Sequence, residues 1–366
     1  MAAGTTDGVT ALVIGDPHFR VKEADVSWLM INNIVKISKS KQPDFIVILG
    51  DTLDTHERIH VDPLTRATTM IDQLRKVAPV YLLIGNHDLR NNQVFLEQEH
   101  PFVALKQWED VTVIDQPKEW TIRGLSFLGV PYVPPGRFEE GLKVSGLLAD
   151  IEQRTCLFAH QEFRGGRLSQ TIKSQEGDLY PKEWPLCVSG HLHEPHRLGN
   201  NVIYLGTPIQ QDFGAANNKA IGFFTFYSRS TSSKSESCDD FLYERLSLIE
   251  VPQRILIKID YSDLDLDTKL ELAYHQMTSP SVKSKPRIKI IITIKQVSTK
   301  LINRHPLIRK LKKLGVKIDL KIEVEEKPDH LEHDLDRNKI SFISILHQLL
   351  DDAPELKEYY TTKFSH

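Results

Sequence analysis

Short runs of Val, Ile and Leu recur along the first part of the chain, and each run leads into a cluster of polar residues. Continuous apolar runs of this length predict strands that are buried on both faces, as in a parallel sheet. Ligands of open α/β sheets bind beyond the carboxyl ends of the strands. The pattern therefore predicts a binding site where several buried strands end. The runs are "ALVIGDPH", "DFIVILGDTLD", "VYLLIGNHD", "TCLFAHQEF", "PLCVSGHLHEPH" and "NVIYLGTP".

Helical patterns separate the first three of these runs. Residues 23–41 and 62–77 show them, and the second opens with Asp-Pro, which is a helix start signal. In the first segment the residues at helical spacing are Trp28, Ile31, Ile34 (or Val35) and Ser38. Residues 111–115 and 120–135 predict a strand pair ahead of a proline-rich loop. The alternation of strands and helices predicts an α/β fold in which two packed sheets are flanked by helices.

The pattern changes near residue 251. Strand-like segments at 254–264, 287–297 and 316–325, with a basic helix candidate at 305–315, predict a small separate α+β domain. Residues 228–240 are of low complexity and predict an exposed hairpin tip, and helical spacing returns at 338–360. We therefore expect three parts: residues 1–250, residues 251–328, and an acidic linker with a C-terminal helix at 329–366.

The polar residues that follow the predicted strands form five clusters, which together contain Asp16, His18, Asp51, Asp54, Asn86, His87, Asp88, His160, His191 and His193. A single cluster would be weak evidence, because a lone histidine is more often structural. Five clusters after buried strands predict a site for two metal ions, which can activate water and clamp a phosphate. Imidazole, carboxylate and amide ligands suit Mn, Fe or Zn better than Mg or Ca. Asp51 is the best candidate for a bridging carboxylate.

The motifs "GDPH", "GDTLD", "GNHD", "AH" and "GHLH", in this order, resemble the calcineurin-like metallophosphoesterase pattern over about residues 11–208. The resemblance implies a four-layer αββα sandwich that holds two divalent metal ions. One would be held by Asp16, His18, Asp51 and His193, and the other by Asp51, Asn86, His160 and His191. The resemblance also implies that His87 assists the leaving oxygen and that Asp88 orients His87. A loop-capping role for Asp88 is an open alternative.

Within this superfamily the sequence around the motifs is most similar to the SbcD-type nucleases of double-strand-break repair, above all their phage-type members. The segments "HQEFRGG", "KSQEGD", "SGHLH" and "YLGTP" carry this resemblance. It implies a Mn²⁺-dependent DNA exonuclease, with endonuclease activity left open, in which residues 251–328 form a DNA-capping domain. Cellular members often have histidine at the position of Asp54. In this chain Asp54 could orient a metal ligand by a hydrogen bond. The roles of His56 and His60 stay open.

The same resemblance implies partner proteins. The C-terminal helix at 340–360 would dock on an SMC-like coiled-coil ATPase, although a helix folded onto its own domain is an equal alternative. A homodimer would form through the helix near residues 65–77 and the loop after His87.

Charge supports DNA as a partner independently of the resemblance. The whole chain carries a formal net charge of −3, but residues 283–321 contain thirteen Lys or Arg and one acidic residue, Asp319. An isolated run of this kind is usually a solvated surface. Beside a phosphodiester-cleaving site it favours a face that tracks DNA phosphates, and without a base-reading motif the binding is expected to be sequence-tolerant.

Cysteine usage and hydropathy indicate the compartment. Cys156, Cys187 and Cys238 show no CxxC spacing, and the first two lie in apolar runs, so a reducing compartment (cytoplasm or nucleus, for a cellular or a viral protein) is expected. The first ten residues have no signal-peptide pattern, and no apolar run approaches the ~20 residues of a membrane span.

Two other functions compete with the nuclease. The first is a phosphoesterase of another class, which acts on a protein or a small molecule. The second is a non-catalytic scaffold with the same fold; it is disfavoured because this chain has a candidate at every expected ligand position.

Overall fold

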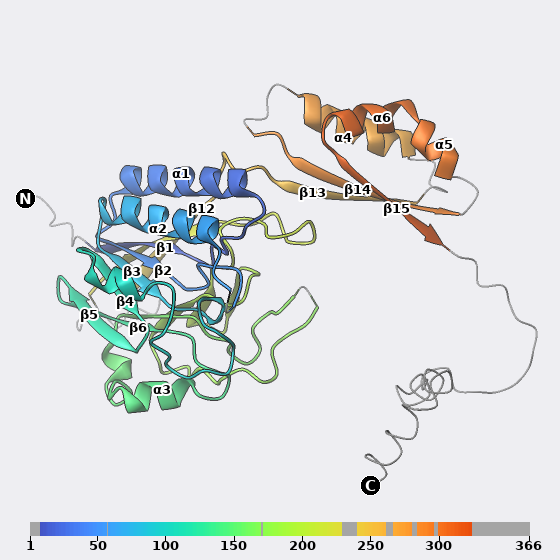
Figure 1. Cartoon of the computed structure of the whole chain (residues 1–366). Helices are drawn as coiled ribbons and strands as arrows, with labels where there is room; N and C mark the ends of the chain where they lie inside the picture. The colour runs from blue at the N-terminus through green and yellow to red at the C-terminus, as the bar shows by residue number, and fades with distance from the viewer. Residues whose placement is uncertain are drawn as a thin grey trace, which may run out of the picture. The chain divides into compact units, whose positions relative to one another are not determined.

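The computed structural model describes residues 8–56, 58–169, 171–228, 240–260, 266–279, 284–295 and 299–323. Within these residues the chain forms two six-stranded sheets and one three-stranded sheet (Figure 1). No helix among them is long and apolar enough to cross a membrane. The expected C-terminal helix at 340–360 and most of the expected hairpin tip at 228–240 lie outside the described residues.

The first sheet has the strand order β12-β11-β1-β2-β3-β4. Strands β1 to β4 run parallel, and β11 and β12 pair antiparallel at one edge. Because four neighbouring strands are parallel, the segments that follow them meet at the same edge of the sheet. The bounds are β1 Val9–Ile14, β2 Phe45–Ile48, β3 Val80–Leu83, β4 Val111–Ile114, β11 Ile221–Phe226 and β12 Phe241–Leu246.

The second sheet has the order β5-β6-β7-β8-β10-β9. Strands β6, β7, β8 and β10 are parallel, and each edge is closed by an antiparallel strand. The bounds are β5 Lys118–Ile122, β6 Leu125–Val130, β7 Cys156–Ala159, β8 Leu186–Ser189, β9 His196–Leu198 and β10 Val202–Tyr204.

Alternate residues of the buried strands serve two cores, which produces four layers. In β1, Ala11 and Val13 pack into the core between the sheets, whereas Leu12 and Ile14 pack beneath the helices α1 (Ala24–Lys41) and α2 (Val61–Arg75). A third cluster joins the outer face of the second sheet to α3 (Phe138–Val144). The αββα sandwich is therefore confirmed. Short 3-10 helices lie at Asn86–Asp88, Val103–Gln107 and Ile151–Gln153.

Helix α1 confirms the helical spacing of its segment, although Trp28 is 39% exposed because the buried stripe is centred on Met30, Ile31 and Ile34. One local prediction was wrong. The segment 111–115 does not pair with 120–135: β4 joins β3 in the first sheet, and the hairpin is formed by β5 and β6. Its two-residue turn has φ of 48° at Arg123 and 81° at Gly124, and positive φ at both positions suits tight hairpins.

The third sheet has the order β13-β14-β15, with bounds Arg254–Asp260, Arg287–Lys295 and Lys317–Glu323. Helices α4 (Leu266–Thr278), α5 (Thr299–Arg304) and α6 (Pro306–Lys313) lie on one face of it (Figure 1). Ile290, Leu270 and Ile308 are buried in the cluster between this sheet and its helices. The segment has the α+β character that the sequence predicts, and α4 is an addition to it.

Candidate metal centre

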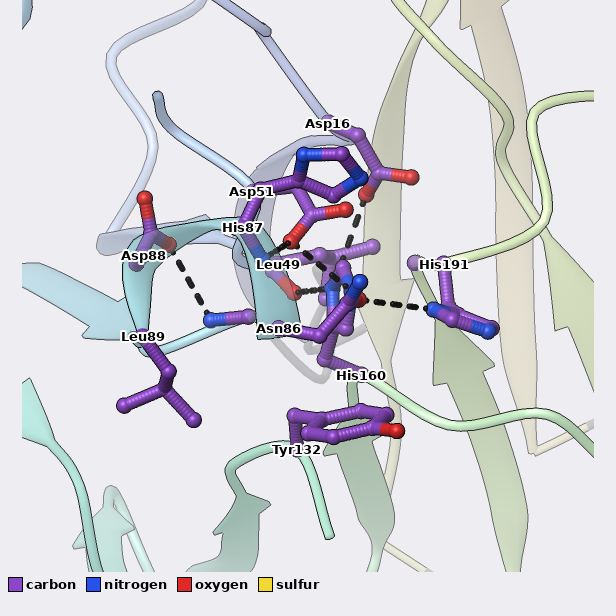
Figure 2. A network of polar contacts seen from close by, with 12 residues as sticks. Asp16, Leu49, Asp51, Asn86, His87, Asp88, Leu89, Tyr132, His160 and His191 are labelled. Atoms are coloured by element: carbon purple, nitrogen blue, oxygen red, sulfur yellow. Dashed lines mark hydrogen bonds and ion pairs between the residues drawn. The ribbon is translucent and has the colours of Figure 1, made fainter. Parts of the chain in front are cut away.

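Each predicted cluster directly follows a buried strand. Asp16 and His18 follow β1, Asp51 and Asp54 follow β2, and the 3-10 helix Asn86–Asp88 follows β3. From the second sheet, β7 leads into His160, and β8 leads into His191 and His193. The structure brings nine of the ten residues into one connected set of contacts, part of which is drawn in Figure 2. The tenth, Asp88, binds backbone groups of neighbouring residues.

The first group of possible metal ligands is Asp16, His18, Asp51 and His193. Their donor atoms all lie within 4.8 Å of one another. The Nε2 atoms of His18 and His193 are 2.9 Å apart, and Nε2 of His18 lies 3.7 Å from Oδ2 of Asp51. Two imidazole nitrogens that face each other this closely suit the coordination of one shared cation.

The second group is Asp51, His160 and His191, whose donor atoms also lie within 4.8 Å of one another. Oδ1 of Asn86 lies 3.0 Å from Nε2 of His160 and 2.9 Å from Nδ1 of His191, so the amide oxygen completes this group (Figure 2). Asp51 belongs to both groups. This is the position that a bridging carboxylate requires.

The donor set fits two cations. Asp16 is fully buried, and neither of its carboxylate oxygens has a hydrogen-bond partner among the described residues. Burial raises the pKa of Asp16 to about 8, and this effect outweighs the opposing one of the His160 imidazole, whose Nδ1 lies 3.8 Å from Oδ1 of Asp16. A divalent cation would bind the two oxygens that lack a hydrogen bond, and the mixture of imidazole, carboxylate and amide donors suits Mn, Fe or Zn.

Neighbouring groups fix which nitrogen of each imidazole is free. Nδ1 of His160 donates to the carbonyl oxygen of Leu49 at 2.8 Å, which leaves Nε2 directed at the site. Nε2 of His191 lies 3.7 Å from a carboxylate oxygen of Glu162, which leaves Nδ1. Such supporting contacts orient metal-binding histidines. Burial lowers the pKa of His160, but the Asp51 carboxylate outweighs it and raises the pKa to about 9.

Asn92 and Tyr132 support Asn86, the possible amide ligand, and the sequence motifs give no sign of either. Nδ2 of Asn86 donates to Oδ1 of Asn92 at 3.2 Å, and the Tyr132 hydroxyl donates to the carbonyl oxygen of Asn92 at 3.0 Å. The amide of Asn86 can therefore present only its oxygen to the two histidines. Glu162, which follows His160 by two residues, was also missed.

His87 is oriented by backbone and not by Asp88. Nδ1 of His87 donates to the carbonyl oxygen of Asp54 at 2.8 Å, and its backbone N–H donates to Oδ1 of Asp51 at 2.8 Å. The role of orienting His87 that the resemblance implied for Asp88 is thus taken by the Asp54 carbonyl.

Asp88 instead connects the loop after β2 with the loop after β3 by hydrogen bonds. Its carboxylate accepts backbone N–H groups at 3.2, 2.9 and 3.1 Å, from Thr52, Leu53 and Gly85 respectively. Burial raises the pKa of Asp88 to about 6. These contacts agree with the loop-capping alternative.

The side chain of Asp54 approaches a possible metal ligand, as expected. Its Oδ1 lies 3.4 Å from Nδ1 of His18 and 3.0 Å from Nη2 of Arg20. Burial raises the pKa of Asp54, but His18 and Arg20 outweigh it and the pKa is lowered overall.

The backbone at the site is strained and closely packed. His18, Asp51 and His191 have φ of 47°, 44° and 74°, a left-handed region that residues with a side chain rarely adopt. A Cβ on Gly85 would lie 2.3 Å from Oδ1 of Asp51, and one on Gly190 would lie 2.3 Å from Oδ1 of Asp16. Glycine therefore precedes Asn86 and His191 because the carboxylates occupy the space of a side chain.

Comparison with known proteins identifies relatives of the chain. The family profile described as calcineurin-like phosphoesterase matches residues 9–195. "Putative phosphoesterase 078R" of invertebrate iridescent virus 3 is 43% identical over 213 residues, which are 58% of this chain and 61% of that protein. "Putative phosphoesterase 244L" of invertebrate iridescent virus 6 is 36% identical over 269 residues, which are 72% of this chain and 91% of that protein.

The match thus spans less than two thirds of the first relative and most of the second. Among solved structures, GAP50, the anchor in the inner membrane complex of Plasmodium, aligns with a TM-score of 0.38 and 15% sequence identity over 66% of this chain and 85% of that chain. This structural similarity is too weak to support a conclusion.

Proposed function

The chain belongs to the calcineurin-like phosphoesterase family, and we propose that it is a metal-dependent phosphoester hydrolase whose substrate is DNA. It would be a two-metal nuclease similar to the SbcD type. It would act as an exonuclease in DNA repair or recombination, and Mn²⁺ would be its preferred ion. The observation that carries the proposal beyond a general phosphoesterase is the basic surface of the small α+β segment.

In this proposal the two groups of ligands hold one cation each. Asp16, His18, Asp51 and His193 would hold the first, and Asp51, Asn86, His160 and His191 the second. When bound, the two cations polarise the phosphoester and lower the pKa of a water molecule. Nδ1 of His87 is bound to the Asp54 carbonyl, so Nε2 is the nitrogen left for the reaction. In its imidazolium form His87 would give the proton on Nε2 to the leaving oxygen.

Helix α6 is the strongest support for DNA as the substrate. It buries Ile308 and Leu311 and exposes four basic side chains: Arg309, Lys310, Lys312 and Lys313. Among the described residues none of the four forms an ion pair; Lys312 donates to Oδ1 of Asn303, and Lys310 lies 5.8 Å from the Tyr274 ring centroid. Exposed cations without carboxylate partners are suited to contact DNA phosphates.

The basic strand β14 is a weaker support than its sequence predicts. Arg287 pairs with Glu23 and Asp25 at 3.1 and 2.5 Å, and Lys289 pairs with Asp319 at 2.9 Å. These side chains are already neutralised within the protein. We therefore assign the phosphate-contacting role to α6 in place of the alternating face of β14.

The partners and the compartment belong to the proposal as well. A homodimer, an SMC-like ATPase and an intracellular, reducing compartment rest on the sequence resemblance and the cysteine pattern. Both viral relatives are named only as phosphoesterases.

The proposal is tested by incubating end-labelled duplex and single-stranded DNA with the purified chain and Mn²⁺. We expect degradation that EDTA and His87→Ala both abolish, with a product ladder that reports the polarity. Hydrolysis of a phosphomonoester without cleavage of DNA would assign the protein to the alternative, a phosphoesterase for a protein or a small molecule.

The role of α6 is tested by changing Arg309, Lys310, Lys312 and Lys313 to Gln. We expect DNA cleavage to fall and its salt dependence to weaken, while hydrolysis of a small chromogenic diester is retained. A control with the same change in charge replaces four exposed lysines of the phosphoesterase helices and their ends: Lys36, Lys39, Lys76 and Lys143. Equal losses in both variants, or equal losses on DNA and on the diester, would contradict the assignment to α6.

A further inference from the structure

The ring of His56 is stacked on the ring of His87. Their centroids are 4.5 Å apart and their planes are inclined by 21°. The rings of His18 and His87 are nearly perpendicular, with centroids 5.0 Å apart and an interplanar angle of 84°. His87 thus contacts two other imidazole rings, which restricts rotation of its own ring.

Each of the two stacked rings forms a hydrogen bond with a backbone carbonyl of the other ring's loop. His87, on the loop after β3, donates from Nδ1 to the carbonyl oxygen of Asp54, on the loop after β2. His56, on the loop after β2, binds the carbonyl oxygen of Leu89, on the loop after β3, through Nδ1 at 3.2 Å. A carbonyl oxygen has no proton to give, so Nδ1 is the donor in both rings. Each loop therefore supplies the anchor for the histidine of the other.

We propose that His56 is a positioning residue that holds His87 in the orientation needed to protonate the leaving oxygen. The inference rests on the proposed phosphodiester hydrolysis. In that reaction a water oxygen bonds to phosphorus, and the bond from phosphorus to the leaving oxygen breaks with its electron pair on that oxygen. His87 reacts as an imidazolium: Nδ1 keeps the proton that it donates to the Asp54 carbonyl, and the proton on Nε2 goes to the leaving oxygen. The attacking water loses one proton to the solvent, and Nε2 takes one proton back from the solvent, so that atoms and charge balance.

This role predicts an effect that depends on the leaving group. A nucleoside alkoxide is a poor leaving group and needs the proton, whereas nitrophenolate is stabilised by its nitro group and leaves without one. Misplacement of His87 should therefore slow cleavage of a thymidine dinucleotide and spare the p-nitrophenyl ester of thymidine monophosphate. A purely structural defect would slow both reactions equally.

The test compares His56→Ala and His56→Phe with the wild type on both diesters in Mn²⁺. We expect His56→Ala to lower kcat on the dinucleotide by on the order of tenfold to a hundredfold, with KM, Mn²⁺ affinity and the nitrophenyl reaction nearly unchanged. Phenylalanine keeps a flat ring against His87, so His56→Phe should recover much of the loss. His60→Ala is the control, because His60 lies at the end of the same loop, directly before α2, and the ring contacts of His87 among the described residues are with His18 and His56.

Three results would overturn the inference: equal losses on both diesters, no loss in His56→Ala, or a phenylalanine variant as impaired as the alanine variant. A wild type that leaves DNA and the dinucleotide intact would refute the nuclease proposal instead. In that case methyl and nitrophenyl phosphate monoesters repeat the same comparison, so that the two failures remain distinguishable.

Discussion

Nδ1 of His87 lies 2.8 Å from the carbonyl oxygen of Asp54, so that the backbone of one residue orients the ring of the other. The carboxylate of the same Asp54 lies 3.4 Å from Nδ1 of His18, a possible metal ligand. Asp54 therefore supports His87 through its backbone carbonyl and His18 through its carboxylate. A side-chain substitution removes only the second support.

We predict that Asp54→Ala weakens Mn²⁺ binding by on the order of tenfold, because contacts that orient a ligand are commonly worth this much. Asp54→Asn keeps an oxygen toward His18 and should lose less. Isothermal titration calorimetry measures the affinity of each variant. The ratio of dinucleotide to nitrophenyl hydrolysis should stay that of the wild type, because His87 keeps its carbonyl partner. A changed ratio would show that the carboxylate also controls His87.

Asn92 should determine which end of the Asn86 amide faces the cations. Asn92→Ala removes the acceptor for Nδ2 of Asn86, and rotation of the amide would then present N–H groups to the second group of ligands. We expect a loss of Mn²⁺ affinity of about tenfold at one of the two sites. Asn92→Asp retains an acceptor and serves as the matched control. If both variants bind Mn²⁺ as the wild type does, Asn92 has no part in orienting Asn86.

The sequence predicted the parts of this molecule that depend on strand periodicity and on the positions of polar residues. Buried strands that end in Asp16, Asp51, Asn86, His160 and His191 were correctly placed, because a parallel sheet brings such ends together. Apart from the approach of Asp54 to His18, the contacts that orient the possible ligands were not predicted. They come from backbone carbonyls, such as that of Leu49, and from residues outside the motifs, such as Asn92.

The partner of β4 shows a second limit of sequence reasoning. The segment 111–115 has the alternation of a strand, but nothing in it states which sheet it joins. Its position beside β3 depends on how the chain crosses from one sheet to the other before Lys118, which is a tertiary property. The stacking of His56 on His87 is tertiary as well, because the two residues lie on different loops.

The glycine before His191 should be intolerant of substitution. A Cβ on Gly190 would lie 2.3 Å from Oδ1 of Asp16 and 2.9 Å from Nδ1 of His160, so Gly190→Ala must displace two possible ligands. We expect Mn²⁺ binding to be lost and unfolding to require about 1–3 kcal/mol less free energy. Gly141→Ala, on α3, is the control, since its Cβ would meet nothing closer than 3.6 Å and should be neutral or stabilising. Thermal melting with and without Mn²⁺ measures both variants.

Binding of metal ions should release protons near neutral pH. Burial raises the pKa of Asp16 to about 8, and the Asp51 carboxylate overcomes burial to raise that of His160 to about 9. Both groups hold a proton below these values, and both must lose it before an oxygen or nitrogen can bind a cation. The apparent affinity for Mn²⁺ should therefore rise with pH up to about 9 and then level off. Lowered pKa values would produce the opposite result, an affinity that is already constant near neutral pH.

Calorimetric titration with Mn²⁺ in buffers of different ionisation enthalpy counts the protons released. We expect about two protons near pH 7 and a number that falls toward zero near pH 10, where both groups are already deprotonated. His87→Ala is the control, because His87 is not among the proposed ligands and its loss should leave the number unchanged. Release of no protons near pH 7 would mean that Asp16 and His160 are not the residues that receive the cations.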